Sequence, residues 1–365
     1  MLHSRDPDPT DSNVSLSVES YGRIHFGLME ICDGQPHCFG GIGVMIDHSR
    51  AIVQAKLQNQ SERLSRSFTP ESCHIEADQY WLPRIEAIVN AWHTRFGSVP
   101  VESLALHSTP VPHCGLGSGT QLACTLVAAL LAAHRHSDDA KHTCTFTFAT
   151  IPKLLESLDA DPAFSNLRPI ERLSALSQRG KRSNIGLCGF LQGGFVVDRG
   201  ETIAQRTQHF SFPEQWPILI IQDLTSLGDS GTAESKMFEQ CSQSPNPNRS
   251  QMLHCIDQEI LPALANRDWV QFDHALGTYG RWAGQIFEPV QGGIYRTPQI
   301  ANAIAEASKL GITGASQSSW GPSICAIARD DDHAKWCEAR LRTNLTNARI
   351  HATKAINHAA RLCLP

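Results

Sequence analysis

A glycine-rich segment followed at once by an apolar helix is the part of this sequence best suited to bind an anion. The segment reads Pro-Val-Pro-His-Cys-Gly-Leu-Gly-Ser-Gly-Thr-Gln over residues 110–121, and Leu-Ala-Cys-Thr-Leu-Val-Ala-Ala-Leu-Leu follows it. Glycine accepts positive φ and lets a ligand approach the backbone closely. The first turn of a helix adds unpaired N–H groups and the positive end of the helix dipole. These features predict a phosphate or pyrophosphate site.

The segment is neither a P-loop, since no Lys-Ser/Thr pair follows its last glycine, nor a dinucleotide-binding loop. A tight strand-to-helix turn without a ligand is the alternative interpretation. Three glycines and two hydroxyls exceed what such a turn needs. The phosphate-binding residues that we expect here are Gly115, Leu116, Gly117, Ser118, Gly119, Thr120 and Gln121.

A second loop of small and hydroxylated residues spans 311–322, with the sequence Gly-Ile-Thr-Gly-Ala-Ser-Gln-Ser-Ser-Trp-Gly-Pro. Such a loop can pack against the first one and close over the same phosphate. An ordinary surface loop is the alternative. Its expected phosphate-binding residues are Ser316, Gln317, Ser318 and Ser319.

A cluster of cations supplies the third candidate, Gln-Arg-Gly-Lys-Arg-Ser-Asn-Ile-Gly over residues 178–186. Arg179, Lys181 and Arg182, with Ser183 beside them, suit a phosphate or a carboxylate. A solvated basic turn is the alternative, although the glycines that follow suggest a compact loop beside a site. A fourth candidate is the pair Arg23 and His25, which alternation along a strand places on one face, but such a pair is more often structural.

Four carboxylates are candidate ligands for Mg²⁺: Glu30, Asp47, Asp198 and Asp223. Mg²⁺ usually takes one or two protein carboxylates together with substrate phosphates. We therefore expect at most two of the four to serve.

Composition limits the class of protein. The 365 residues carry a formal net charge of −5, which argues against a nucleic-acid-coating protein. No apolar run is long enough to span a bilayer, and the polar N-terminus does not look like a secretory signal. The twelve cysteines include no Cys-x-x-Cys pair, so we expect reduced thiols in a cytoplasmic protein.

Hydrophobic periodicity predicts a mixture of strands and helices. Expected strands span 16–29, 40–46, 51–57, 104–107, 194–198, 216–223, 324–328 and 348–353, and expected helices span 77–96, 120–134, 151–158, 169–178, 251–264, 269–286, 299–310 and 332–343. Residues 137–150 read as a variable loop, and 240–250 as a polar connector. Because strands and helices do not alternate strictly, an α+β fold is favoured over a doubly wound sheet.

The motifs together resemble the GHMP kinase superfamily. Pro-His-Cys-Gly-Leu-Gly-Ser-Gly, from residue 112, looks like its central Pro-x-x-x-Gly-Leu-Gly-Ser-Ser-Ala motif, and the loop at 311–322 stands where its third motif is found. The resemblance is more specific to one branch, the β-ribofuranosylaminobenzene 5'-phosphate synthases. It rests on the motifs at residues 23–28, 40–43, 115–121, 179–195 and 317–322. Gly-Thr-Gln in place of Ser-Ala departs from the kinases and suits this branch. The branch tends to carry an aspartate soon after its first motif, where this chain has only Glu30.

The resemblance implies a two-subdomain fold, with a part similar to ribosomal protein S5 before a ferredoxin-like part. We place a flexible tail at 1–15 and the subdomains at 16–200 and 201–365. The implied reaction joins 4-aminobenzoate to phosphoribosyl pyrophosphate with loss of CO₂ and pyrophosphate, in tetrahydromethanopterin biosynthesis. Mg²⁺ is the implied cofactor and a homodimer the implied assembly. Arg23, His25, Arg179, Lys181 and Arg182 are the catalytic candidates.

Two other functions stay open at this stage. One is an ATP-dependent GHMP small-molecule kinase with ATP in the same glycine loop. The other is a catalytically inactive protein that keeps the loop to bind a phosphorylated metabolite. The Gly-Thr-Gln ending of the first loop favours the synthase over both.

Overall fold

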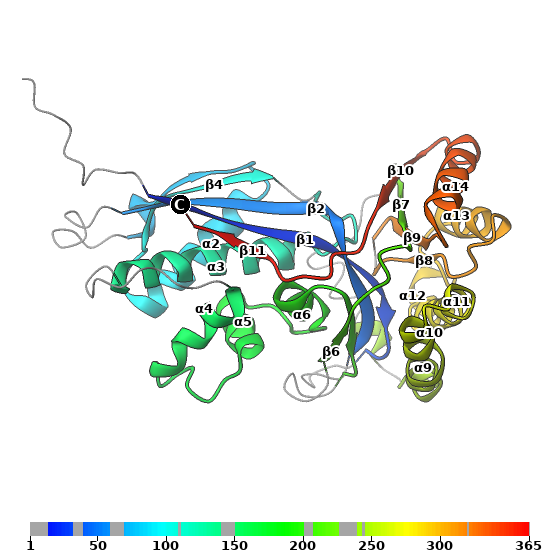
Figure 1. Ribbon diagram of the computed structural model, residues 1–365, viewed down its shortest axis with the longest axis horizontal. Helices are drawn as coiled ribbons and strands as arrows, with labels where there is room; N and C mark the ends of the chain where they lie inside the picture. The colour runs from blue at the N-terminus through cyan, green and yellow to red at the C-terminus, as the bar shows by residue number, and fades with distance from the viewer. Residues whose placement is uncertain are drawn as a thin grey trace, which may run out of the picture.

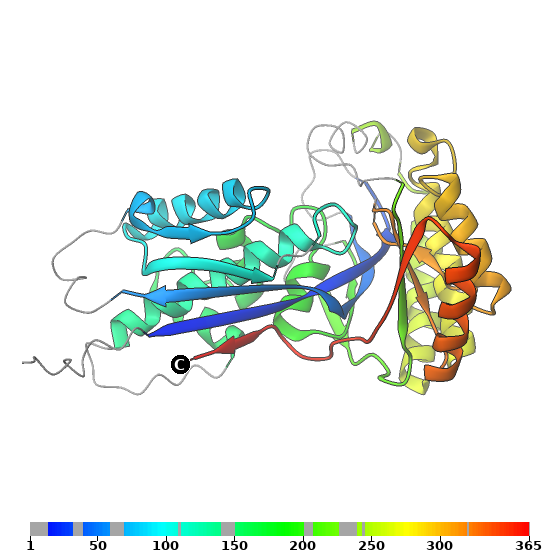
Figure 2. The same cartoon turned by 90° about the horizontal axis from the view of Figure 1, so that it is seen from above.

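The computed structural model describes residues 14–31, 39–58, 69–108, 111–139, 150–200, 207–225, 239–242, 245–319 and 321–364. The strands of this part of the chain form two sheets, one with seven strands and one with four. Figures 1 and 2 show the sheets side by side along the long axis, each with its own group of helices. The expected α+β class is confirmed.

The seven-stranded sheet has the order β11-β1-β2-β4-β3, with β5 paired to β2 and β6 paired to β5. Its strands are β1 Ser15–Leu28, β2 Gly41–Leu57, β3 His74–Glu76, β4 Val101–Ser108, β5 Phe195–Asp198, β6 Thr207–Phe210 and β11 Arg361–Cys363. Only β3 and β4 pair in parallel. On one edge β2 pairs with β1; on the other, its two ends pair with β5 and β4. This long strand therefore connects the two ends of the sheet.

The prediction of two strands over 40–57 is wrong, because β2 runs through without a break. The stretch between the two expected strands includes Asp47 and Arg50, which form an ion pair at the surface. Arg50 also pairs with Glu19 of β1. Ser20 pairs with Ala51 and Gly22 with Ile46, so residues 47–50 form a bulge in β2 opposite Tyr21 of β1.

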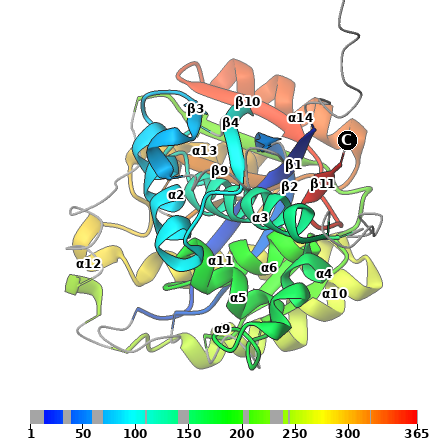
Figure 3. The same cartoon turned by 90° about the vertical axis from the view of Figure 1, so that its left-hand side faces the viewer.

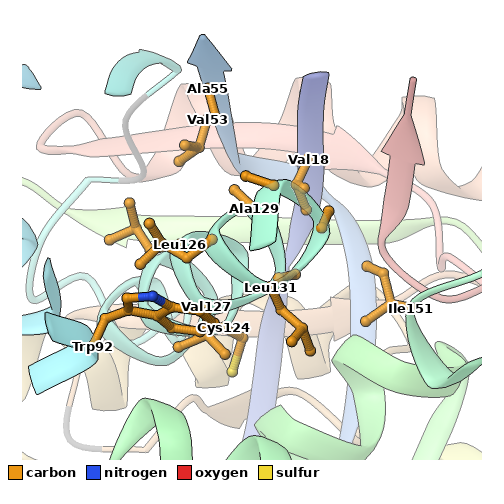
Figure 4. Packing of buried hydrophobic residues seen from close by; sticks show 14 of the residues in the cluster. Val18, Val53, Ala55, Trp92, Cys124, Leu126, Val127, Ala129, Leu131 and Ile151 are labelled. Atoms are coloured by element: carbon orange, nitrogen blue, oxygen red, sulfur yellow. The ribbon is translucent and has the colours of Figure 1, made fainter. Parts of the chain in front are cut away.

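One helix forms the centre of the first core. The helical segments here are η1 Pro70–Ser72, α2 Leu82–Phe96, α3 Ser118–Asp139, α4 Ile151–Glu156, η2 Ser157–Ala160, α5 Pro169–Ser177 and α6 Ile185–Gln192. Helix α3 packs on β1 and β2, and Figure 4 shows Leu126, Ala129 and Leu131 among the side chains that fill this layer. Burial of this apolar face positions α3, whose first residue, Ser118, lies inside the glycine segment.

The glycines that follow the cationic cluster were expected to form a compact loop, and this is wrong for Gly186 and Gly189, which lie in the buried helix α6. A Cβ at Gly186 would lie 2.9 Å from Cγ2 of Thr120, and one at Gly189 would lie 2.6 Å from Cγ of Met45. These glycines therefore allow close packing of a helix, which local sequence cannot distinguish from loop chemistry.

The four-stranded sheet is covered on both faces. Its strands are β7 Ile218–Asp223, β8 Ser316–Gln317, β9 Ser323–Ile327 and β10 Ala348–Thr353, in the order β10-β7-β9-β8. Along β7, Ile218 and Ile220 join a core shared with the first sheet, and Leu219 and Ile221 join a second core under α13 and α14. A continuous apolar run is the pattern of a strand buried on both faces.

The helices around this sheet are α9 Arg249–Cys255, η3 Ile256–Ile260, α10 Leu261–Asn266, α11 Trp269–Gln285, α12 Glu288–Gln291, α13 Pro298–Lys309 and α14 Asp331–Asn344. Side chains of Asp268, Thr297 and Asp330 accept hydrogen bonds from the first turns of α11, α13 and α14, as N-caps do. None of the helices within the described residues combines the length and apolarity that a membrane crossing needs.

The predicted boundary at residues 200 and 201 stays a prediction. Strands β6 and β11 follow it in sequence but pair with strands that precede it, and Figure 3 shows β11 beside β1. The tail at 1–13 and most of the loop at 137–150 lie outside the described residues.

Candidate active site

The end of β1 and the two glycine loops are held together by hydrogen bonds of the backbone. The N–H of Arg23 donates to Leu116 O over 2.9 Å, and the N–H of Ser319 donates to His25 O over 2.9 Å. The hydroxyl of Ser318 donates to Gly115 O over 2.8 Å and accepts from the N–H of His25 over 3.2 Å. The expected packing of the second loop against the first is therefore confirmed.

Two glycines make this junction possible. A Cβ at Gly115, where φ is +82°, would lie 2.6 Å from Ser318 O, and a Cβ at Gly321 would lie 2.6 Å from the backbone N of Gly115. Both obstacles are backbone atoms, which cannot move aside as a side chain can. The loops meet only because neither position carries a side chain.

A cavity of about 390 Å³ opens beside this junction. Its lining residues are Arg23, His25, Leu28, Thr120, Gln178, Arg179, Gly180, Lys181, Arg182, Ser183 and Ser319. The structure thus brings together all five catalytic candidates and, from three separate segments, three of the expected phosphate ligands. Four of the lining side chains are cationic and none is a carboxylate, so the cavity suits an anionic ligand.

Several expected phosphate ligands are buried or form hydrogen bonds with other residues of the protein. Gln121 is fully buried and donates through Nε2 to Gly186 O, and Gln317 accepts from the N–H of Arg296. Ser316 donates to Gly314 O. Leu116 belongs to the core that the two sheets share, and Ser118 begins α3 as a buried residue. Phosphate binding by the remaining loop residues stays a prediction.

His25 is a buried, uncharged group in the cavity wall. Its Nδ1 accepts from the N–H of Gly27 over 3.1 Å, which assigns the ring proton to Nε2. Burial, and then the charge of Arg23, hold the pKa of His25 well below its usual value. Among the described residues Nε2 has no hydrogen-bond partner. The ring is therefore a neutral imidazole whose Nε2 is buried close to Gly41.

A residue that sequence reasoning missed lies at the edge of the glycine loop. Arg84, on α2, reaches the first turn of α3: a Cβ at Gly119 would lie 3.0 Å from its Nη1 and 3.8 Å from Nη2 of Arg179. Burial and the nearby charge of Arg84 lower the pKa of Arg179. The sequence marks Arg84 only as one polar residue on an amphipathic helix, so no local signal identified it.

The four candidate metal ligands have separate roles. Asp198 accepts from the N–H groups of Asn184 and Gly200, and Glu30 accepts from the N–H of Asn246. Asp223 accepts from Thr225, and Asp47 pairs with Arg50. None of the four lines the cavity, and the described residues contain no cluster of three metal-binding side chains. These carboxylates do not fit a protein-held metal in the cavity, and Mg²⁺ stays a prediction.

The family of GHMP kinases C-terminal domains matches residues 260–347. Two curated relatives, from Methanothermobacter thermautotrophicus and Archaeoglobus fulgidus, are both named β-ribofuranosylphenol 5'-phosphate synthase. The first is 23% identical over 86% of this chain and 89% of its own length, and the second is 23% identical over 95% and 99%.

Solved structures share the fold over nearly the whole chain. Homoserine kinase from Cytophaga hutchinsonii aligns with a TM-score of 0.60 at 12% identity, covering 99% of this chain and 100% of that one. Mevalonate diphosphate decarboxylase from Enterococcus faecalis aligns with a TM-score of 0.61 at 11% identity, covering 97% and 100%. The chain thus carries a match to the GHMP kinases C-terminal family over residues 260–347 and shares the fold of these solved structures over nearly its whole length.

Proposed function

We propose that this protein transfers a phosphoribosyl group from phosphoribosyl pyrophosphate to 4-aminobenzoate, releasing CO₂ and pyrophosphate. The observation that carries the proposal is the cavity beside the joined glycine loops, lined by four cationic side chains and no carboxylate. The donor brings a phosphate and a pyrophosphate, and the acceptor brings a carboxylate. Three anionic groups therefore need compensation in one site, which the cationic lining can provide.

The reaction asks mainly for alignment and for exclusion of water. The bond from the anomeric carbon to pyrophosphate breaks, and the ring carbon that bears the carboxylate attacks the cationic centre. The para amino group supplies electron density to that carbon, and loss of CO₂ restores aromaticity, so no base need remove a ring proton. Water at the same centre would hydrolyse the donor, and the cavity walls must keep it out.

The cations fall into two groups by position. Arg179, Lys181 and Arg182 lie on the turn after α5, and we assign them to the ribose 5-phosphate or the benzoate carboxylate. Arg23, at the end of β1, is the second candidate for the carboxylate. When bound with pyrophosphate, Mg²⁺ would neutralise part of its charge. The described carboxylates supply no ligand set for it in the cavity, so no step here depends on a protein-held metal.

The two relatives are named for a ribofuranosylphenol product, so the para substituent of the acceptor needs a test of its own. An amino group and a hydroxyl both donate electrons to the attacking carbon. We propose 4-aminobenzoate on the motif resemblance, and 4-hydroxybenzoate is the comparison substrate that tests the choice.

The decisive experiment measures radiolabelled CO₂ released from carboxyl-labelled 4-aminobenzoate in the presence of phosphoribosyl pyrophosphate and Mg²⁺. We expect release that depends on both substrates, with the aryl riboside phosphate identified by mass spectrometry. Release from 4-hydroxybenzoate alone would move the acceptor to the phenol series. No release from folded protein with either acid would contradict the proposal.

The kinase fold of the solved neighbours supports one alternative, ATP-dependent phosphorylation of a small molecule. Transfer of the γ-phosphate of ATP to a sugar or an alcohol, without CO₂ release, would decide for it. The Gly-Thr-Gln ending of the glycine loop weighs against this alternative.

A further inference from the structure

Two arginines from distant parts of the chain converge on the start of α3. Arg84 comes from the first turn of α2, and Arg179 comes from the turn after α5. Their guanidinium groups approach the same point from two elements: a Cβ at Gly119 would lie 3.0 Å from Nη1 of Arg84 and 3.8 Å from Nη2 of Arg179. Like charges brought this close repel one another unless an anion lies between them.

Protein carboxylates do not provide that anion in the described part of the chain. Neither arginine forms an ion pair with an aspartate or glutamate there. By contrast, Arg95, on the same helix as Arg84, pairs with Asp161 over 2.8 Å. A converging pair without a carboxylate is the arrangement of an anion-binding site rather than of a structural ion-pair network.

Aromatic rings fix the direction of Arg84. Its guanidinium lies 5.4 Å from the ring centre of Tyr80 and 5.2 Å from that of Trp81. Cation–π contacts of this kind restrain a side chain that would otherwise sample many rotamers. The group is therefore held toward the glycine loop before any ligand arrives, which lowers the entropy cost of binding.

We propose that Arg84 and Arg179 form a two-arginine clamp for a pyrophosphate-type anion over Gly119. The clamp reassigns Arg179 to the pyrophosphate, while Lys181 and Arg182 on the same turn keep their assignment to the ribose 5-phosphate or the benzoate carboxylate. The inference rests on the proposed function only in identifying the anion as the leaving group of phosphoribosyl pyrophosphate. A nucleotide polyphosphate shares the same chemistry, and the experiment separates the two sources.

The test measures the binding of inorganic pyrophosphate by calorimetry to the full-length protein and to Arg84→Met. Methionine keeps an apolar stem against Tyr80 and Trp81 but removes the charge. We expect the dissociation constant to rise by about tenfold or more, since a charge-assisted hydrogen bond contributes about 1.5–3 kcal/mol. The matched control is Arg95→Met, which removes another ring-stacked arginine of α2 and should bind pyrophosphate like the wild type.

Arg84→Lys provides a second variant if Arg84→Met fails to fold. It keeps the charge and loses the planar fork, so weaker pyrophosphate binding at an unchanged melting temperature supports the clamp. Wild-type affinity in a folded Arg84 variant, or a wild-type protein that does not bind pyrophosphate, overturns it.

Binding measurements with phosphoribosyl pyrophosphate and with an ATP analogue test the clamp separately from the proposed function. Arg84-dependent binding of phosphoribosyl pyrophosphate supports both. A second outcome separates them: the Arg84 variant weakens binding of a non-hydrolysable ATP analogue but not of phosphoribosyl pyrophosphate, and the wild type releases no CO₂. That result supports the clamp and overturns the synthase.

Discussion

The two walls of the cavity are built in different ways. The wall formed by β1 and the two glycine loops is fixed by backbone hydrogen bonds, and its closest contacts involve backbone atoms of Gly115, Ser318 and Gly321. The opposite wall is the turn at 178–183, whose contribution is charged side chains, with Lys181 exposed. One wall therefore sets the geometry of the site, and the other supplies three of its four cationic side chains.

The largest expected effect comes from disturbing the fixed wall. Gly117 has φ +74°, and a Cβ there would lie 2.5 Å from Cγ of Arg23. We expect Gly117→Val to displace Arg23 and lower CO₂ release by about a hundredfold or more, because misplacement of about 1 Å can cost that much. Circular dichroism should show that the fold survives.

Gly97 provides a matched control for this change. It has nearly the same backbone angle, φ +75°, but nothing lies within 4 Å of its Cβ position. Gly97→Val therefore carries the backbone strain alone, at a cost in stability of about 1–2 kcal/mol. Full activity in Gly117→Val would refute the assignment of this loop to the site.

Substitution of a charged residue in the turn at 178–183 should have a smaller effect on catalysis, confined to one of the two substrates. We expect Arg182→Ala to raise the apparent KM for one of the two substrates by about tenfold, since a hydrogen bond to a charged group contributes about 1.5–3 kcal/mol. Steady-state kinetics with each substrate varied in turn would identify the anion that Arg182 holds. Unchanged kinetics for both substrates would remove Arg182 from the site.

The buried His25 makes the stability of the protein depend on pH. Its folded-state pKa is lowered, so below a pH of about 6.5 the unfolded chain binds a proton that the folded chain does not, and stability falls as pH decreases. One such proton changes the free energy of unfolding by up to about 1.4 kcal/mol per pH unit.

The measurement is urea unfolding at several pH values from neutral to mildly acidic, on the wild type and on His25→Gln. We expect the variant to lose part of this pH dependence. His48, whose pKa is also lowered, by burial and by His351, stays in both proteins and does not affect the difference. Identical pH slopes for the two proteins would show that His25 is not buried as a neutral ring.

The smallest effect is expected outside both walls. Asp47 was a candidate metal ligand, but it pairs with Arg50 at the surface. Asp47→Asn should change the free energy of unfolding by less than about 1 kcal/mol and leave CO₂ release and its dependence on Mg²⁺ unchanged. A large loss of activity that excess Mg²⁺ restores would show that Asp47 is a metal ligand after all.

The sequence was sufficient for features that depend on local pattern. Hydrophobic periodicity predicted β1, α11 and α13, and a continuous apolar run predicted β7. The glycine loops were predicted since glycine and hydroxyl residues have few other reasons to gather there. The sequence did not decide whether the cationic turn at 178–183 is part of a site or an ordinary solvated turn. Its position in the wall of the cavity distinguishes the two.

Features that depend on distant contacts could not be predicted. Gly186 and Gly189 look like loop residues until Thr120 and Met45 are seen against them. Arg84 is one arginine on an amphipathic helix until Arg179 is placed beside it. Asp198 resembles a metal ligand until its hydrogen bonds to Asn184 and Gly200 are known. In each case the deciding neighbour lies far away in sequence or on another element.

The ratio of CO₂ to pyrophosphate released by the protein from labelled 4-aminobenzoate and phosphoribosyl pyrophosphate separates the proposed reaction from its alternatives. We expect equal amounts of the two products, with both lost together in Gly117→Val and retained in Gly97→Val. Pyrophosphate without CO₂ would mean hydrolysis of the donor in the cavity, and release of neither would contradict the proposed reaction.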